Sequence, residues 1–209
     1  NIVSYKMAQA DADALKKAFK GLGCDKKTVV DITVNRTNAQ RQQIREAYKA
    51  SYGRDLMKDL KSELHGHLED GILALFTDPI EYDADELRKA MKGMGTNEDT
   101  LIEIIASRPP HMLKMIIQKF KEKYDRDLEK DVKSETSGTL RKLLIALLQC
   151  GRGTNTNPNQ AQCAQIAQEI FQAGEKKLGT DESIFNKYFC TLSPHELAAV
   201  SREYHKLTG

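Results

Sequence analysis

An internal repeat constrains this chain more than any other feature, because the sequence matches itself after a shift of 72 residues. Single positions such as Arg36 and Arg108 follow the same spacing as the longer matches. So many matches in one register indicate a duplicated structural unit. The matched stretches are 20–23 with 92–95, 52–56 with 124–128, and 61–63 with 133–135.

A third, incomplete copy follows at a longer distance. Residues 179–182 (Gly-Thr-Asp-Glu) echo residues 95–98 (Gly-Thr-Asn-Glu) after 84 positions. The extra length lies in residues 151–160, which are polar and rich in Gly, Asn and Pro, and this composition predicts an exposed connector. We expect one repeat at residues 8–77, a second at 80–149, a connector at 150–162 and a partial repeat at 163–209.

Apolar residues recur at helical spacing in each repeat, whereas strand-like alternation and hairpin turns are absent, so we predict an all-α fold. Asn38 is a good N-cap for a helix, and Pro109 with Pro110 suits a helix start in the second repeat. The first repeat is expected to hold helices near 12–20, from 28, 38–52, 55–64 and 68–76. Their expected apolar faces contain Leu15, Ala18, Phe19, Leu22, Val29, Val30, Ile32, Val34, Leu56, Leu60, Leu64, Ile72, Leu73, Leu75 and Phe76.

The charge balance argues against a nucleic-acid partner and against a membrane contact that depends on the charge of the protein alone. With 32 basic and 30 acidic residues, the formal net charge is +2, and no basic stripe or aromatic-studded sheet indicates a nucleic-acid partner. The same balance argues against a membrane contact driven by the charge of the protein alone. If the protein meets an anionic surface, another source of positive charge is required.

The four cysteines form no Cys-x-x-Cys pair, so we expect free and mostly buried thiols in a reducing compartment rather than a zinc or redox site. No apolar run reaches transmembrane length, and residues 1–6 contain no signal-peptide hydrophobic region. We therefore expect a cytoplasmic protein and leave unconventional secretion open.

Two loops in each repeat carry the candidate chemistry. The first contains Gly21 and Gly23, or Gly93 and Gly95, and such glycines allow backbone angles that turn several carbonyl oxygens toward one point. The second, between the fourth and fifth helices, contains Glu63 or Glu135, 40 residues after the second glycine. Calcium takes six to eight oxygen ligands at about 2.3–2.6 Å, so carbonyls with one bidentate carboxylate leave room for water or a lipid phosphoryl oxygen. An ion so bound would supply the missing positive charge.

A purely structural interpretation of these loops is also open. Gly-x-Gly after a helix is commonly a C-cap, and an acidic residue in a loop is commonly an N-cap. Duplication preserves structural loops as well as binding loops, so repetition alone does not decide between the two interpretations.

Four stretches, at residues 92–98, 38–42, 52–56 and 131–138, together resemble the annexin family. The resemblance covers essentially the whole chain. It implies five-helix repeats in a curved right-handed array, with calcium on the convex face and reversible binding to acidic phospholipids of the phosphatidylserine type. Annexins usually have four repeats, whereas this chain has two and about two-thirds of a third.

The resemblance also assigns ligands residue by residue. It implies carbonyl ligands and one bidentate acid in each complete repeat, and a third loop whose acid would lie beyond Gly209. Weaker auxiliary sites resemble those at Thr96 with Glu98, and at Lys61 and Leu64 with Glu69. The main ligands are Phe19, Gly21, Gly23 and Glu63 in repeat 1, and Met91, Gly93, Gly95 and Glu135 in repeat 2. The third loop offers the carbonyls of Gly174, Lys177 and Gly179 as weaker candidates in an incomplete site.

Several residues depart from the family pattern. Cys24 replaces a threonine in the first loop, and Lys26 and Lys27 occupy positions that are often acidic, which puts an auxiliary ion there in doubt. Leu192 stands where Arg36 and Arg108 stand. The family is also associated with a central hydrophilic channel, whose lining matches Asp83, Glu86, Glu103 and Arg108, but we expect these residues to form a buried polar network between repeats.

The leading hypothesis is calcium-dependent binding to acidic phospholipid membranes. The alternative is a calcium-independent scaffold or cytoskeleton-associated protein that uses the same repeats, and self-association stays open. We do not expect an enzyme, because the sequence contains no nucleophile–base constellation, P-loop or dinucleotide fingerprint.

Overall fold

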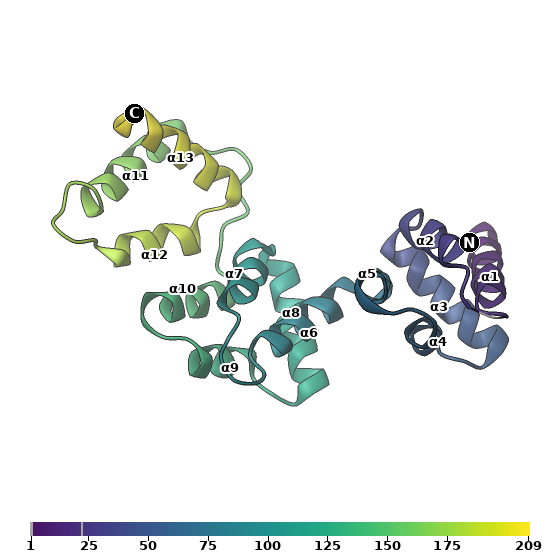
Figure 1. Ribbon diagram of the computed structural model, residues 1–209. Helices are drawn as coiled ribbons and strands as arrows, with labels where there is room; N and C mark the ends of the chain where they lie inside the picture. The colour runs from purple at the N-terminus through teal and green to yellow at the C-terminus, as the bar shows by residue number, and fades with distance from the viewer. Residues whose placement is uncertain (1, 22) are drawn as a thin grey trace. The chain divides into compact units, whose positions relative to one another are not determined.

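The computed structural model describes residues 2–21 and 23–209, and over these residues it contains thirteen helices and no strand (Figure 1). Residues 1–82 and 83–209 form two compact units. None of the described helices combines the length and the apolar character needed to cross a membrane. The predicted all-α fold is confirmed.

The first unit holds one complete set of five helices. Its core consists of buried residues from every one of these helices, including Leu15, Val29, Ile44, Leu60 and Phe76. The helices are α1 (Ile2–Ala18), α2 (Lys26–Val34), α3 (Asn38–Tyr52), α4 (Leu56–Glu63) and α5 (Gly66–Phe76).

Polar caps set the helix boundaries. The Asp25 carboxylate accepts the Thr28 N–H at 3.1 Å at the start of α2. At the start of α3 the cap is Thr37, not Asn38 as predicted, because Thr37 and Gln40 form a reciprocal capping box. Asn38 is instead the first helical residue, and its amide donates to the carbonyl of Thr77 at 2.7 Å.

The second unit repeats this set and adds three more helices. The chain enters it along α6 (Pro79–Ala90), which begins in the first unit, and continues through α7 (Glu98–Ser107), α8 (Pro110–Tyr124), α9 (Leu128–Glu135) and α10 (Gly138–Leu148). The third copy consists of α11 (Gln160–Ala173), α12 (Glu182–Thr191) and α13 (Pro194–Thr208). Pro110 begins α8, as predicted for that position.

Most of the predicted apolar faces are buried, with two corrections. Val34 is 59% exposed and Leu75 is 42% exposed. Val34 ends α2 away from the face that buries Val29 and Ile32, and Leu75 lies beside the stripe formed by Ile72 and Phe76. Leu22 lies outside the described residues.

The connector is largely exposed but is anchored by hydrogen bonds. The Gly153 N–H donates to the carbonyl of Thr191 at 2.8 Å, and the Ser193 hydroxyl donates to the carbonyl of Asn155 at 2.6 Å. The Arg152 guanidinium donates to the carbonyls of Ala106 in α7 and Phe189 in α12. The connector therefore ties the second and third helix sets together within the unit.

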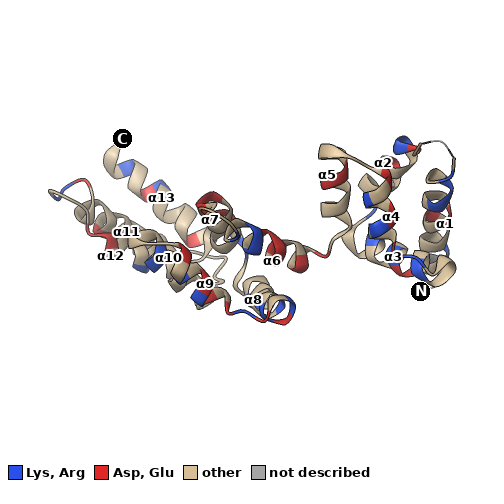
Figure 2. Cartoon of the chain, turned by 60° about the horizontal axis from the view of Figure 1, so that its bottom comes forward, with Lys and Arg blue, Asp and Glu red and all other residues tan. Residues whose placement is uncertain are grey.

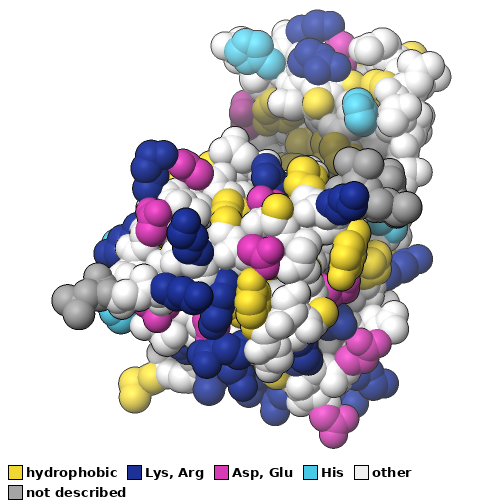
Figure 3. Space-filling model, turned by 90° about the vertical axis from the view of Figure 1, so that its right-hand side faces the viewer, with side chains coloured by type: hydrophobic (Ala, Val, Ile, Leu, Met, Phe, Trp, Pro, Cys, Tyr) yellow, Lys and Arg dark blue, Asp and Glu magenta, His cyan; other side chains and the backbone are white. Residues whose placement is uncertain are grey.

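Charge is spread over the surface rather than gathered in one field. Figure 2 shows acidic and basic residues on helices of both units, and Lys and Arg lie among Asp and Glu on the face viewed in Figure 3. All four cysteines have free thiols, and Cys163 and Cys190 are buried.

Candidate functional site

The loop after the first helix has the same closed form in all three repeats. In each, a backbone N–H at the start of the second helix donates to the carbonyl of the last residue of the first helix at 2.8–2.9 Å. This hydrogen bond holds the loop ends together, so the residues between them project outward. The pairs are Asp25 with Ala18, Asn97 with Ala90, and Asp181 with Ala173.

Glycines give the first two loops their backbone path. Gly21 and Gly93 have φ values of 110° and 115°, and Gly23 and Gly95 both have φ of 92°. Side-chain-bearing residues rarely adopt such angles. No atom would lie within 4 Å of a Cβ at any of these positions, so backbone conformation, rather than lack of space, requires glycine here.

The second-repeat loop leaves its predicted ligand oxygens free of hydrogen bonds. Among the described residues, the carbonyls of Met91, Gly93 and Gly95 accept none, whereas those of Ala90 and Thr96 each accept a backbone N–H. In the first loop, the carbonyls of Phe19, Gly21 and Gly23 likewise accept no hydrogen bond from a described residue. Carbonyl oxygens without a hydrogen-bond donor suit a hard cation such as calcium.

The distant glutamate of repeat 2 lies against the glycine loop. Glu135 is the last residue of α9, and its Oε2 accepts a hydrogen bond from Thr96 Oγ1 at 2.9 Å. The same hydroxyl lies 3.2 Å from the carbonyl oxygen of Glu135. A carboxylate 39 residues along the chain is thus held beside the loop carbonyls.

Repeat 1 has a thiol at the position where repeat 2 has the hydroxyl. Cys24 occupies the position of Thr96, and Glu63 ends α4 as Glu135 ends α9. Partial burial, and after it the nearby Glu63 carboxylate, raises the pKa of the Cys24 thiol. Glu63 is therefore close enough to the first loop to act on Cys24 electrostatically.

Neither predicted acid caps a helix. Both end their helices, and the N-cap residues of the following helices, His65 and Ser137, make no side-chain cap hydrogen bond. No group of three His, Cys, Asp or Glu side chains that would suit a metal occurs in the described part of the chain. An ion at these loops would therefore rely on carbonyl oxygens with one carboxylate, which is the chemistry of calcium rather than of zinc.

The third loop differs from the first two. It is one residue longer between its closing partners, and only Gly179, with φ of 89°, has a positive φ. The Gly174 carbonyl already accepts the Lys177 N–H at 3.0 Å, so one of the three predicted carbonyl ligands is engaged. The carbonyls of Lys177 and Gly179 accept no hydrogen bond from a described residue.

Apolar residues lie at the tips of these loops. Met94 and Leu178 occupy equivalent positions directly before Gly95 and Gly179, and both side chains are fully exposed at 106% and 105%. Met91, by contrast, is buried at 5%. The sequence did not indicate this difference, although the position of Met94 between two glycines is a signal that could have done so.

The residues of the weaker predicted sites occupy the same two loop regions. The Thr96 carbonyl accepts the Glu98 N–H at 3.1 Å, so Thr96 contributes to the turn before α7. Lys61 lies in the last turn of α4, Leu64 is its buried C-cap, and Glu69 lies in the first turn of α5.

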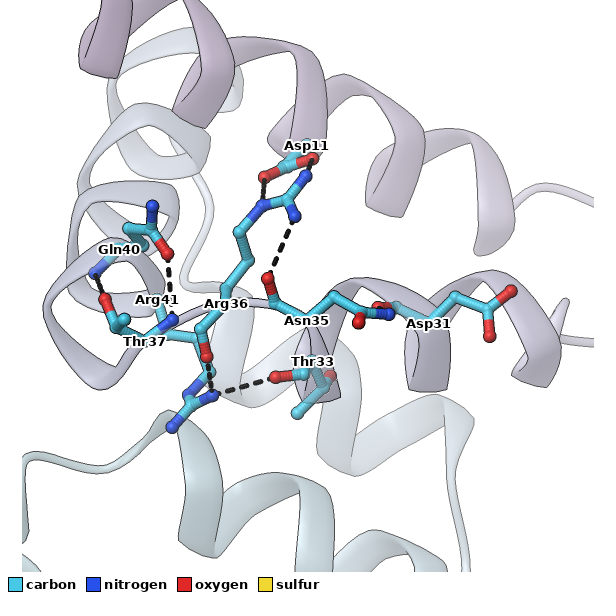
Figure 4. A network of polar contacts seen from close by, with 8 residues as sticks. All are labelled: Asp11, Asp31, Thr33, Asn35, Arg36, Thr37, Gln40 and Arg41. Carbon is cyan, nitrogen blue, oxygen red and sulfur yellow. Dashed lines mark hydrogen bonds and ion pairs between the residues drawn. The ribbon is translucent and has the colours of Figure 1, made fainter.

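Of the four residues predicted to form a buried polar network between repeats, Asp83 and Arg108 pair with each other within repeat 2, Glu86 pairs with Lys89 at 3.6 Å, and Glu103 is exposed. Arg108 binds Asp83 through two hydrogen bonds of 2.6 and 2.9 Å, and Asp83 is only 3% exposed. Arg36 binds Asp11 in the same way in repeat 1, where Figure 4 shows the two side chains facing one another. These bonds raise the pKa of both arginines. The pair joins the first helix to the end of the second, and the 72-residue spacing of Asp11 and Asp83 could have revealed it.

Comparison with known proteins agrees with this architecture. The family model described as Annexin matches residues 10–75, 82–147 and 165–209. Annexin A7 of Macaca fascicularis is 47% identical over 202 residues, which cover 97% of this chain and 41% of that protein. The chain thus spans about two-fifths of the length of this relative.

Solved structures share the fold. The structure of chicken annexin V superposes with a TM-score of 0.86 at 43% identity, covering 97% of this chain and 64% of that one. A calcium-bound annexin (Sm)1 gives a TM-score of 0.83 at 28% identity, covering 96% and 61%. The family model and these relatives do not indicate a catalytic family.

Proposed function

Because this chain belongs to the annexin family, we propose that it binds acidic phospholipid membranes in a calcium-dependent manner through the loop pairs of its first two repeats. Each pair would contribute three carbonyl oxygens and one carboxylate. In repeat 1 these are Phe19, Gly21 and Gly23 with Glu63, and in repeat 2 they are Met91, Gly93 and Gly95 with Glu135. A calcium ion held there supplies positive charge to lipid phosphoryl oxygens.

The observation that carries the proposal is the meeting of Glu135 with the second glycine loop. Thr96 holds the carboxylate beside carbonyls that accept no hydrogen bond from the described residues. The protein itself has nearly balanced charge, so without a bound cation it has little general attraction for an anionic surface.

The loop tips support a membrane contact. The exposed Met94 side chain projects from the same loop as the free carbonyls. An apolar side chain at this position can enter the interfacial region of a bilayer once the adjacent charges are satisfied. We therefore expect peripheral association of a cytoplasmic protein when calcium rises.

The remaining predicted ligands are proposed as weaker sites. Gly174, Lys177 and Gly179 form a third loop with one engaged carbonyl, and we expect it to need more calcium than the first two. Thr96 with Glu98, and Lys61 and Leu64 with Glu69, are proposed as auxiliary sites.

Co-sedimentation with phosphatidylserine vesicles over a calcium series, with a chelator control, tests the proposal. Replacing a charged ligand by its amide removes about 1.5–3 kcal/mol of interaction, so Glu63→Gln with Glu135→Gln should raise the calcium requirement at least about tenfold. Glu122→Gln, in an exposed side chain on α8, is the matched control and should leave the titration unchanged. Equal binding in chelator and in calcium would refute the proposal and favour a calcium-independent scaffold.

A further inference from the structure

A hollow of about 490 Å³ lies between α1 and α2 on the inner side of the first loop. This volume falls within the range of small-ligand sites, about 300–1,000 Å³. Glu63 is not among the lining residues but Gly23 is, so the hollow borders the proposed calcium site of the first loop. The lining residues are Ala14, Lys17, Ala18, Lys20, Gly23, Cys24, Asp25 and Thr28.

Lysines surround this hollow and are largely unpaired. Lys17 and Lys20 line it, and Lys26 directly follows the lining residue Asp25 in the sequence. Among the described residues, none of these three makes an ion pair, whereas Lys27 pairs with Asp31 at 2.6 Å. Figure 2 shows basic residues at the end of α1 and at the start of α2.

The one carboxylate in the lining is already occupied. The Asp25 side chain accepts the Thr28 N–H at 3.1 Å and the Thr28 hydroxyl at 2.7 Å. These hydrogen bonds direct its oxygens toward the helix end. It therefore opposes only part of the lysine charge.

The same hollow exists in repeat 3 with a different charge. There it has a volume of about 430 Å³, and five of its eight lining residues are equivalent in position to lining residues of the first hollow, with Gln172 in place of Lys17. Its Lys177 is paired with Asp181 at 3.7 Å, and Glu169 adds a second carboxylate. Repeats 1 and 3 thus both have a hollow between their first two helices, whereas Lys17 and Lys20, which make no ion pair within the described residues, line only the hollow of repeat 1.

Repeat 2 provides the closest sequence control. Lys89 and Lys92 occupy the positions of Lys17 and Lys20, but Glu98 and Asp99 stand where repeat 1 has Lys26 and Lys27. Both repeats thus share two lysines at these positions. Neighbouring acidic residues offset their positive charge in repeat 2, whereas neighbouring lysines add to it in repeat 1.

We propose that the hollow between α1 and α2 of repeat 1 binds a multiply phosphorylated headgroup, and that it does so without calcium. Lysine ammonium groups bind phosphate as compact point charges, and several of them around one hollow select a ligand with more than one phosphate. Such a ligand can be a phosphoinositide in a membrane or a free inositol phosphate. The site does not depend on the carbonyl ligands of the calcium loops.

The test uses the full chain with excess chelator, so that the calcium loops contribute nothing. Binding is measured to phosphatidylcholine vesicles that contain phosphatidylinositol bisphosphate. The control vesicles contain phosphatidylserine instead, in the amount that gives the same total charge. We expect binding to the first and not to the second. Each lysine near an anionic surface contributes about fivefold in affinity, so Lys17→Gln with Lys20→Gln should weaken binding by about 25-fold.

The matched control is Lys89→Gln with Lys92→Gln, which removes the same charges from repeat 2 and should change binding less than about twofold. All four side chains are exposed or half-buried, and a thermal melt of each variant checks that the fold is intact. An equal loss in both double variants would overturn the proposal, because it would show a general charge effect. Unchanged binding of the Lys17→Gln, Lys20→Gln variant would also overturn it.

A competition arm separates the two sources of the ligand. Free inositol hexakisphosphate that displaces the wild-type protein from the vesicles would support a site for soluble or lipid headgroups alike. If inositol hexakisphosphate does not displace the protein but the Lys17→Gln, Lys20→Gln variant still binds the vesicles more weakly, the site binds the headgroup only when it is part of a bilayer. The phosphatidylserine assay in calcium is independent of this result, so either proposal can fail alone.

Discussion

Repeats 2 and 3 have equivalent first helices, but different contacts join these to the second helices. The contact is an ion pair in repeat 2 and an apolar cluster in repeat 3. Repeat 2 uses the ion pair of Asp83 with Arg108. Seven residues before the end of α11, where α6 has Asp83, repeat 3 has Ile166, and Leu192 takes the place of Arg108. Ile166 is buried and Leu192 packs against the same apolar cluster.

This difference shows that the helix framework needs matched partners rather than a particular chemistry. Buried ion pairs and apolar pairs of similar volume often stabilise a fold about equally, but removing one member of an ion pair leaves a costly unpaired charge. The loops differ in a second respect: within the described residues, the three predicted carbonyls of repeat 2 accept no hydrogen bond, whereas in repeat 3 the Gly174 carbonyl accepts the Lys177 N–H. The framework therefore tolerates changes that the binding site does not.

The largest expected effect comes from breaking the ion pair on one side. Arg108→Ala leaves Asp83 almost fully buried without its partner and should lower the free energy of unfolding by about 3 kcal/mol. Asp83→Ile combined with Arg108→Leu copies repeat 3 and should stay within about 1 kcal/mol of the wild type. Urea unfolding of the full chain measures both. Equal costs for the single and double variants would show that the two chemistries are not interchangeable here.

A smaller loss is expected at the loop glycine that repeats 2 and 3 share, Gly95 in repeat 2 and Gly179 in repeat 3. Gly95→Ala places a side chain at φ of 92° and should cost about 1–2 kcal/mol of stability. The midpoint of thermal unfolding should fall by about 2–4 °C for each kcal/mol. Gly151→Ala is the control, because Gly151 has no positive φ and an added Cβ would meet nothing within 4 Å. If Gly151→Ala lowers the midpoint of thermal unfolding as much as Gly95→Ala does, the loss is not caused by the positive φ of Gly95.

The hydroxyl that holds Glu135 offers a test between the two complete loops. Thr96→Val removes the 2.9 Å hydrogen bond and should raise the calcium needed for phosphatidylserine binding about fivefold, which corresponds to about 1 kcal/mol. Cys24→Thr introduces the same donor beside Glu63 and should lower the requirement of the first site. Thr208→Val, far from the loops in sequence, serves as the control. If Thr96→Val leaves the titration in place, the hydroxyl has no positioning role.

The smallest effect concerns Tyr124, whose place in repeat 3 is taken by Thr208. Burial and the hydrogen bond to Asp85 raise the pKa of Tyr124 to about 12. Its folded pKa therefore lies above the unfolded value of about 10, so its contribution to stability is complete below pH 10 and is lost as the pH rises toward 12. Tyr124→Phe should lower stability by about 1 kcal/mol at neutral pH and flatten the decline between pH 10 and 12. Guanidinium unfolding at several alkaline pH values measures this slope, and an unchanged slope would contradict it.

The repeat register made most of the fold predictable. Helical spacing, glycines after the first helix and caps such as Asp25 are local signals, so the five segments of each repeat could be placed within a few residues. The sequence predicted the N-cap of α3 at Asn38, one residue after the observed cap Thr37, because both of these neighbouring polar residues suit an N-cap. The exposure of Val34 and Leu75 depends on which side of a helix meets its neighbours, and this is not local information.

The sequence by itself determined the number and kind of repeats, the glycine loops and the presence of one acid at a fixed distance from each of the first two loops. Only the tertiary structure decided that Glu135 meets Thr96, that Arg108 binds Asp83 within its own repeat, and that a hollow with unpaired lysines lies behind the first loop. The physical reason is that helix formation depends on neighbours a few residues apart, whereas these contacts join side chains that are distant along the chain and meet only when helices pack.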